Sequence, residues 1–211
     1  MENSGKLFSA IAHRPTASFI IFCRLPFNFP HVGATHPGEL TIEERKSLQG
    51  WSIDRTRSRV GSGREAYTRA VDALLSWRHF SFDWAFTNAP KLQKDAPVVV
   101  IAKSLFLWSM NPLKITAIEK DGPPKGPTQK AVVRRRCGFA HTTVAGHQIS
   151  GEERFTVEWR KDDDSVWYEV YTVSKPATLI AAVARPVLRF YQRKFVQESV
   201  VAMKMEANKG K

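Results

Sequence analysis

Cysteine and long apolar runs are both scarce in this chain of 211 residues. The two cysteines, Cys23 and Cys137, are too few for a disulfide framework and too far apart for a zinc site of closely spaced ligands. The longest apolar run, residues 179–184, is far shorter than the ~20 residues that a helix needs to span a bilayer. No internal repeat is present. The sequence therefore predicts a protein of a reducing compartment, by default the cytoplasm, without a membrane-spanning helix.

Acidic residues are also few: the chain has 20 Asp and Glu against 32 Lys and Arg, a net charge of +12. The basic residues are concentrated in residues 114–136 and 185–211. Such a charge indicates attraction to an anionic partner, and a solvated basic surface is the alternative. An anionic membrane surface is one expected partner. Nucleic acid ranks below it, because Arg134, Arg135 and Arg136 belong to no recognisable nucleic-acid-binding motif.

The first residues differ from the rest of the chain. Residues 1–38 contain a single acid, Glu2, a composition that weakly resembles an organelle transit peptide. The preferred interpretation is a short helix from Arg14 to Arg24, which Leu25-Pro26 ends because the residue before proline avoids the α conformation. We therefore divide the chain into an N-terminal extension (1–24), a single domain (25–206) and a polar tail (207–211).

Two helices stand out in the remaining sequence. Residues 64–77 place apolar side chains on one stripe at helical spacing, and residues 177–205 form a longer helix. Pro186 lies inside the second helix and predicts a kink or two abutting helices. Thr41 followed by Glu44 predicts one further capped helical turn.

Between the two helices the pattern is mostly that of β-strands. Alternation in residues 152–159 and 165–173 predicts a hairpin around the turn at 161–164, and residues 122–130, rich in proline and glycine, predict a loop. Weaker strand patterns cover residues 51–60, 98–103, 113–119 and 130–136. This order predicts an α+β fold in which a curved antiparallel sheet is wrapped around a long C-terminal helix, as in START-like, or helix-grip, domains.

Several segments, taken in order, resemble a family of unknown function, the domain-of-unknown-function family numbered 1990. They are residues 27–35, 60–63, 146–155, 166–170, 174–176 and 192–195, together with Trp77 and Pro186. The resemblance covers roughly residues 25–205 and implies a helix-grip-like fold but no reaction. The chain departs from the family pattern at residues 138–143, where a turn rich in glycine and tyrosine is expected, and in the long loop at 122–130.

Aromatic and aliphatic residues at alternating positions predict an apolar interior between sheet and helix. We expect a cavity that binds a lipid or another apolar or amphipathic small molecule, and a filled core is the alternative. The expected lining consists of Phe155, Val157, Tyr168 and Val170 from the strands and Val187 and Tyr191 from the helix.

His147 with Glu153 or Glu152 is the best candidate for acid–base chemistry, since a carboxylate-oriented histidine transfers protons near neutral pH. The two glutamates are adjacent on a predicted strand, so only one of them faces a cavity. The alternative is that His147 and one glutamate fix a turn. His141 with His147 and Glu153 is considered as a metal site, but we predict no metal.

Two other segments carry weak chemical signals. Gly61-Ser62-Gly63 lacks the Lys-Ser/Thr of a phosphate loop, so we predict no cofactor. Cys137 follows three arginines, which would lower its pKa, although such a cysteine more often ends a strand. The sequence therefore favours a binding module over an enzyme.

Overall fold

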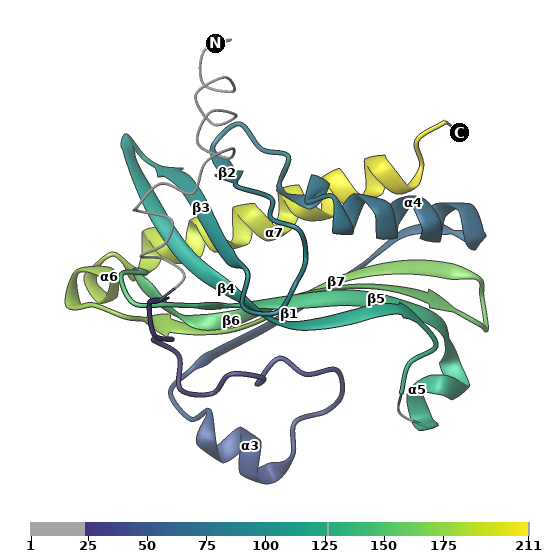
Figure 1. The fold of residues 1–211 in the computed structure, drawn as a ribbon, viewed down its shortest axis with the longest axis horizontal. Helices are drawn as coiled ribbons and strands as arrows, with labels where there is room; N and C mark the ends of the chain where they lie inside the picture. Colours follow the sequence, from purple (N-terminus) through teal and green to yellow (C-terminus); the bar gives the residue numbers. More distant parts are fainter. Residues whose placement is uncertain (1–23, 126, 211) are drawn as a thin grey trace.

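The computed structural model describes residues 24–125 and 127–210 and contains one antiparallel sheet, of seven strands, in the order β1-β7-β6-β5-β4-β3-β2 (Figure 1). Each of the strands β2 to β6 pairs with the next one along the chain, and β1 pairs with β7. The strands are β1 (Ser52–Ser62), β2 (Ala85–Thr87), β3 (Pro97–Ser104), β4 (Leu107–Gly122), β5 (Val133–Thr143), β6 (Ile149–Arg160) and β7 (Ser165–Pro176).

Helices lie on both faces of this sheet. On one face α4 (Gly63–Leu75) and α7 (Arg185–Ala207) pack against each other and against the strands (Figure 1). The short η1 (Arg78–Phe80), which follows α4 in the chain, contacts both of these helices. The other face carries residues 27–51 with α3 (Ile42–Ser47). The remaining helices are α5 (Pro127–Val132) and α6 (Leu179–Val183). The predicted fold class, a curved antiparallel sheet wrapped around a long C-terminal helix, is confirmed.

The break predicted at Pro186 is present. Chain 179–207 forms two helices, and Pro186 lies in the first turn of α7, where a backbone N–H would have no helical partner in any case. The Thr178 side chain caps α6 by accepting from Ala181 N. The predicted capping box is also confirmed, since Thr41 and Glu44 bond to each other's backbone N–H at the start of α3.

Two segments differ from the sequence prediction. Residues 138–143 belong to the long strand β5, not to a turn, because they pair with β4 on one side and β6 on the other. Gly138 is required there by close packing: a Cβ would stand 2.6 Å from the carbonyl oxygen of Phe155. The predicted loop at 122–130 is partly helical in α5.

The main core lies between the sheet and the pair α4–α7. It contains Phe155, Val157, Tyr168 and Val170, all essentially fully buried. The Tyr168 hydroxyl bonds to Ser199 Oγ of α7 at 2.7 Å, which fixes the helix on the strands. A second, smaller core on the other face joins Phe29 and Leu48 to Tyr171 and Val173. No helix in the described residues is both long and apolar enough to cross a membrane.

Residues 1–23 lie outside the described part of the chain, and with them most of the helix predicted from Arg14 to Arg24.

Candidate functional site

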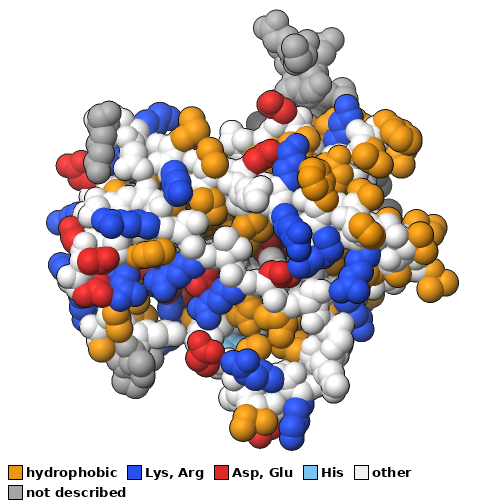
Figure 2. All heavy atoms as spheres, turned by 180° about the vertical axis from the view of Figure 1, so that it is seen from behind, with side chains coloured by type: hydrophobic (Ala, Val, Ile, Leu, Met, Phe, Trp, Pro, Cys, Tyr) orange, Lys and Arg blue, Asp and Glu red, His pale blue; other side chains and the backbone are white. Residues whose placement is uncertain are grey.

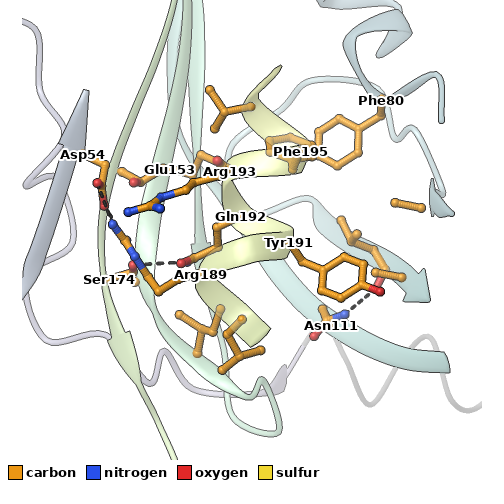
Figure 3. A pocket seen from close by; sticks show the side chains of 18 of the residues that line it. Asp54, Phe80, Asn111, Glu153, Ser174, Arg189, Tyr191, Gln192, Arg193 and Phe195 are labelled. Carbon is orange, nitrogen blue, oxygen red and sulfur yellow. Dashed lines mark hydrogen bonds and ion pairs between the residues drawn. The ribbon is translucent and has the colours of Figure 1, made fainter. Parts of the chain in front are cut away.

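A pocket of about 600 Å³ lies between the sheet and residues 188–201 of α7 (Figure 3). Phe80 and Trp84 contribute to its wall, as do Leu188, Phe195 and Val196 of α7. Aliphatic residues of β3 and β4 complete the apolar part: Val100, Ala102 and Leu113. Further along α7, Ser199 and Met203 are buried, and Val200 belongs both to the core and to the wall of the pocket. The pocket therefore adjoins the filled core along α7.

Charged side chains gather on the β1 side of the pocket. Asp54 of β1 accepts two hydrogen bonds from the guanidinium of Arg189, at 2.6 and 2.8 Å. Arg189 thereby holds the pKa of Asp54 below its usual value. Arg193, one helical turn further, points towards Asp54 and Glu153 (Figure 3). Its charge helps to lower the pKa of Asp54, but its guanidinium makes no hydrogen bond or close ion pair with any described residue. The hydrogen-bond donors of one cation at this end of the pocket are thus left unused.

A histidine–carboxylate pair lies on the floor of the pocket. His141 of β5 and Glu153 of β6 are opposite each other in the strand register, and His141 Nε2 is 3.2 Å from a carboxylate oxygen of Glu153. The other ring nitrogen of His141, Nδ1, is buried and has no hydrogen-bond partner in the described residues. Phe80 and Phe155 pack edge-on against the His141 ring. The pair is therefore held rigidly with one face towards apolar side chains.

His147, the histidine predicted to pair with Glu153, lines the pocket but has another partner. It lies in the loop between β5 and β6, where its Nδ1 accepts a hydrogen bond from Ile149 N at 2.9 Å. Burial, with a smaller contribution from His141, lowers the pKa of His147 to about 4. The ring is therefore neutral near pH 7 and holds the loop, while Glu153 pairs with His141.

Glu152, the alternative partner for His147, has its carboxylate on the opposite face of the sheet. There it accepts hydrogen bonds from Gly33 N at 2.8 Å and from both the N–H and the hydroxyl of Thr35. The hydroxyls of Thr116 and Thr142 also lie within hydrogen-bond distance. Glu152 therefore fastens the N-terminal segment to the sheet. Both glutamates border the pocket, but the hydrogen bonds of the Glu152 carboxylate are to the N-terminal segment and to threonines of β4 and β5.

Of the six residues predicted to line the cavity, Tyr191 does so. Phe155, Val157, Tyr168 and Val170 instead belong to the filled core between the sheet and the pair α4–α7. Val187, which is 36% exposed, lies near the surface at the beginning of α7. Filled core and cavity are thus both present, one beside the other along α7.

Cys137 is not activated by the preceding arginines. Burial raises the pKa of its thiol to about 12, and Asp121 and Glu119 act in the same direction. Within residues 24–125 and 127–210, no three His, Cys, Asp or Glu side chains are grouped in a way that could hold a metal ion.

The predicted lining did not include Phe80, Arg189 or Arg193, and Trp84 was predicted only as one of the aromatic residues of an apolar interior. The spacing of Arg189 and Arg193, four residues apart, is a signal that both lie on one face of the helix. The position of Trp84 depends on a tertiary contact, because its indole N–H donates to Glu198 of α7 at 2.6 Å. No periodicity in the sequence reports such a contact.

The fold and the pocket define a helix-grip protein with a largely apolar pocket between the sheet and α7. The chain belongs to the family described as a domain of unknown function, DUF1990, whose model matches residues 28–202.

The sequence relatives of this chain carry no assigned reaction in their names. A UPF0548 protein of Arabidopsis thaliana is 32% identical over 161 residues, which cover 75% of each chain. A UPF0548 protein of Dictyostelium discoideum is 30% identical over 158 residues, 71% of this chain and 69% of the other. Among solved structures, a START superfamily protein from Mycobacterium smegmatis aligns with a TM-score of 0.43 and 10% identity, over 74% of this chain and 95% of that chain. Family membership therefore assigns no activity.

Proposed function

We propose that the protein binds an amphipathic small molecule, such as a lipid, in the pocket between the sheet and α7. The observation that carries this proposal is the pocket itself, about 600 Å³ in volume and walled by aromatic and aliphatic side chains. Volumes of roughly 300–1,000 Å³ with mostly apolar walls and a few polar groups are typical of small-molecule sites. The apolar part of such a ligand would pack against these aromatic and aliphatic side chains.

The polar side of the pocket specifies the rest of the ligand. Asp54 and Glu153 already have protein partners, in Arg189 and His141. Arg193 interacts with Asp54 through its charge alone and donates no hydrogen bond to a described residue, so its guanidinium is available to a group that accepts hydrogen bonds, such as a carboxylate or a phosphate. We therefore expect the ligand's apolar part near Phe80 and Trp84 and its acceptor group near Arg193.

Native mass spectrometry of the purified full chain, followed by solvent extraction and lipid analysis, tests this proposal. A stoichiometric adduct that is released into organic solvent is the expected result. A clean apo mass that persists after the protein is incubated with a total lipid extract contradicts the proposal.

The His141–Glu153 pair supports a second candidate, an enzyme that moves a proton on a pocket-bound substrate. A carboxylate that orients a histidine is the arrangement used in general acid–base catalysis. The expected result is that a molecule extracted from the protein is chemically altered on incubation with the wild type but not with His141→Gln. An unaltered molecule in both samples would leave binding as the function.

A further inference from the structure

Large apolar side chains are exposed at two places near the start of α7. The first is the turn between β3 and β4, where Phe106 is 80% exposed and its neighbours Leu105, Leu107 and Trp108 are more than half exposed. The second is α6, where Leu179, Ile180 and Val183 are each at least 80% exposed. Together with Met110 and Phe190 we call these residues the apolar end. Soluble monomers rarely expose so many large apolar side chains in one region without a partner.

The two places are joined through α7. Leu105 N donates a hydrogen bond to the Tyr191 hydroxyl at 2.7 Å, so the β3–β4 turn is fixed against this helix. Phe190 precedes Tyr191 and contacts its ring edge-on, and α6 packs directly on α7. In Figure 1 the β3–β4 turn and α6 lie towards the same end of the molecule. The apolar end is therefore a surface held in place by the fold.

Basic side chains border this surface. Lys103 Nζ lies 5.9 Å from the centre of the Trp108 ring, and Lys194 Nζ lies 4.9 Å from that of Trp84. Lys103 and Arg185 make no ion pair with any described residue. Figure 2 shows Lys and Arg side chains beside the hydrophobic ones on this side of the molecule. The chain as a whole carries a net charge of +12.

We propose that the apolar end docks on an anionic lipid bilayer, with Phe106 and Ile180 entering the interface and Lys103 and Arg185 facing acidic head groups. Exposed apolar side chains next to cations are what an interfacial membrane site requires, and tryptophan such as Trp108 favours the head-group level. A second copy of the chain fits less well, because a symmetric contact places like charges from both copies together. This proposal does not depend on the pocket being occupied.

Co-sedimentation of the full chain with vesicles tests the proposal. The two vesicle compositions are phosphatidylcholine alone and phosphatidylcholine mixed with phosphatidylserine. We expect binding to the mixed vesicles that falls as salt is raised. Replacing either Phe106 or Ile180 with Ser weakens this binding about tenfold, because a large side chain no longer leaves water. Lys103→Glu combined with Arg185→Glu weakens it as well.

Ile42→Ser is the matched control. Ile42 is 68% exposed but lies on α3, at the other face of the sheet, and its replacement is expected to leave vesicle binding unchanged. Three results overturn the proposal: no binding to mixed vesicles, binding that Phe106→Ser and Ile180→Ser leave intact, or equal loss with Ile42→Ser. A concentration-dependent dimer that Phe106→Ser abolishes also overturns it and assigns the surface to a second copy.

Discussion

Glu152 and Glu153 are neighbours in β6, and their carboxylates lie on opposite faces of the sheet. Glu153 meets His141 in the pocket, while Glu152 binds Gly33 and Thr35 of the N-terminal segment. The alternation of side chains along a strand produces this division of roles. One glutamate therefore belongs to the candidate site, and the other holds the chain that covers the back of the sheet.

Replacing Glu152 is expected to destabilise the fold. Its carboxylate is 3% exposed, and Glu152→Ala leaves the N–H groups of Gly33 and Thr35 without their acceptor. An unsatisfied buried donor costs free energy, so we expect a loss of about 3 kcal/mol in the free energy of unfolding. Urea denaturation measures it. The control Glu43→Ala, at an exposed position of α3, is expected to change stability little; equal losses would show that the Glu152 contacts do not matter.

Acidification is expected to destabilise the protein through two buried histidines. Burial lowers the pKa of His79 well below its usual value, and it lowers the pKa of His147 to about 4. A histidine in the unfolded chain has a pKa of about 6.5, so it takes up a proton as the pH falls below that value. The folded histidine stays neutral until the pH reaches its own, lower pKa. Stability is therefore fully present above pH 6.5 and is lost as the pH falls towards the folded pKa.

Between pH 7 and pH 5 we expect His147 to cost about 2 kcal/mol, and His79 to destabilise the protein in the same direction. His79→Leu removes one contribution, and no hydrogen bond is lost because neither ring nitrogen of His79 has a partner in the described residues. Urea denaturation at the two pH values compares wild type and variant. An unchanged pH dependence in His79→Leu would contradict the assignment of a neutral, buried ring.

Cys137 is expected to be unreactive in the folded protein. Its thiol is buried, and with its pKa raised to about 12 it is almost never a thiolate near neutral pH. In a Cys23→Ser variant, which leaves one thiol, iodoacetamide should label no protein at pH 8 until denaturant is added. Mass spectrometry counts the label. Rapid labelling of the native protein would instead support an activated cysteine.

The elements that sequence patterns predicted are those set by local rules. The hairpin of β6 and β7, the capped turn at Thr41 and the break at Pro186 follow from alternation, capping and proline geometry. The pairing of His141 with Glu153 does not follow from such local rules, because it requires that residues 138–143 continue β5 in register with β6.

The position of the pocket was likewise not predictable from one sequence. Periodicity identified Phe155 and Tyr168 as inward-facing, and both are buried. An inward-facing side chain of the sheet belongs to the filled core where α4 covers the sheet, and it lines the pocket where α4 does not. Tyr191 lines the pocket from the first half of α7, whereas the buried residues of this helix, from Ser199 to Ala207, lie in its second half.

Filling the pocket tests the central claim, ligand binding between sheet and α7, most directly. Ala102 lines the pocket from β3, and Ala102→Trp places an indole in it; Ala131→Trp makes the same exchange at an exposed position of α5. Native mass spectrometry then compares ligand retained by the wild type and both variants. We predict that Ala131→Trp retains the ligand like the wild type while Ala102→Trp purifies without it. Equal retention by all three proteins would contradict binding in this pocket.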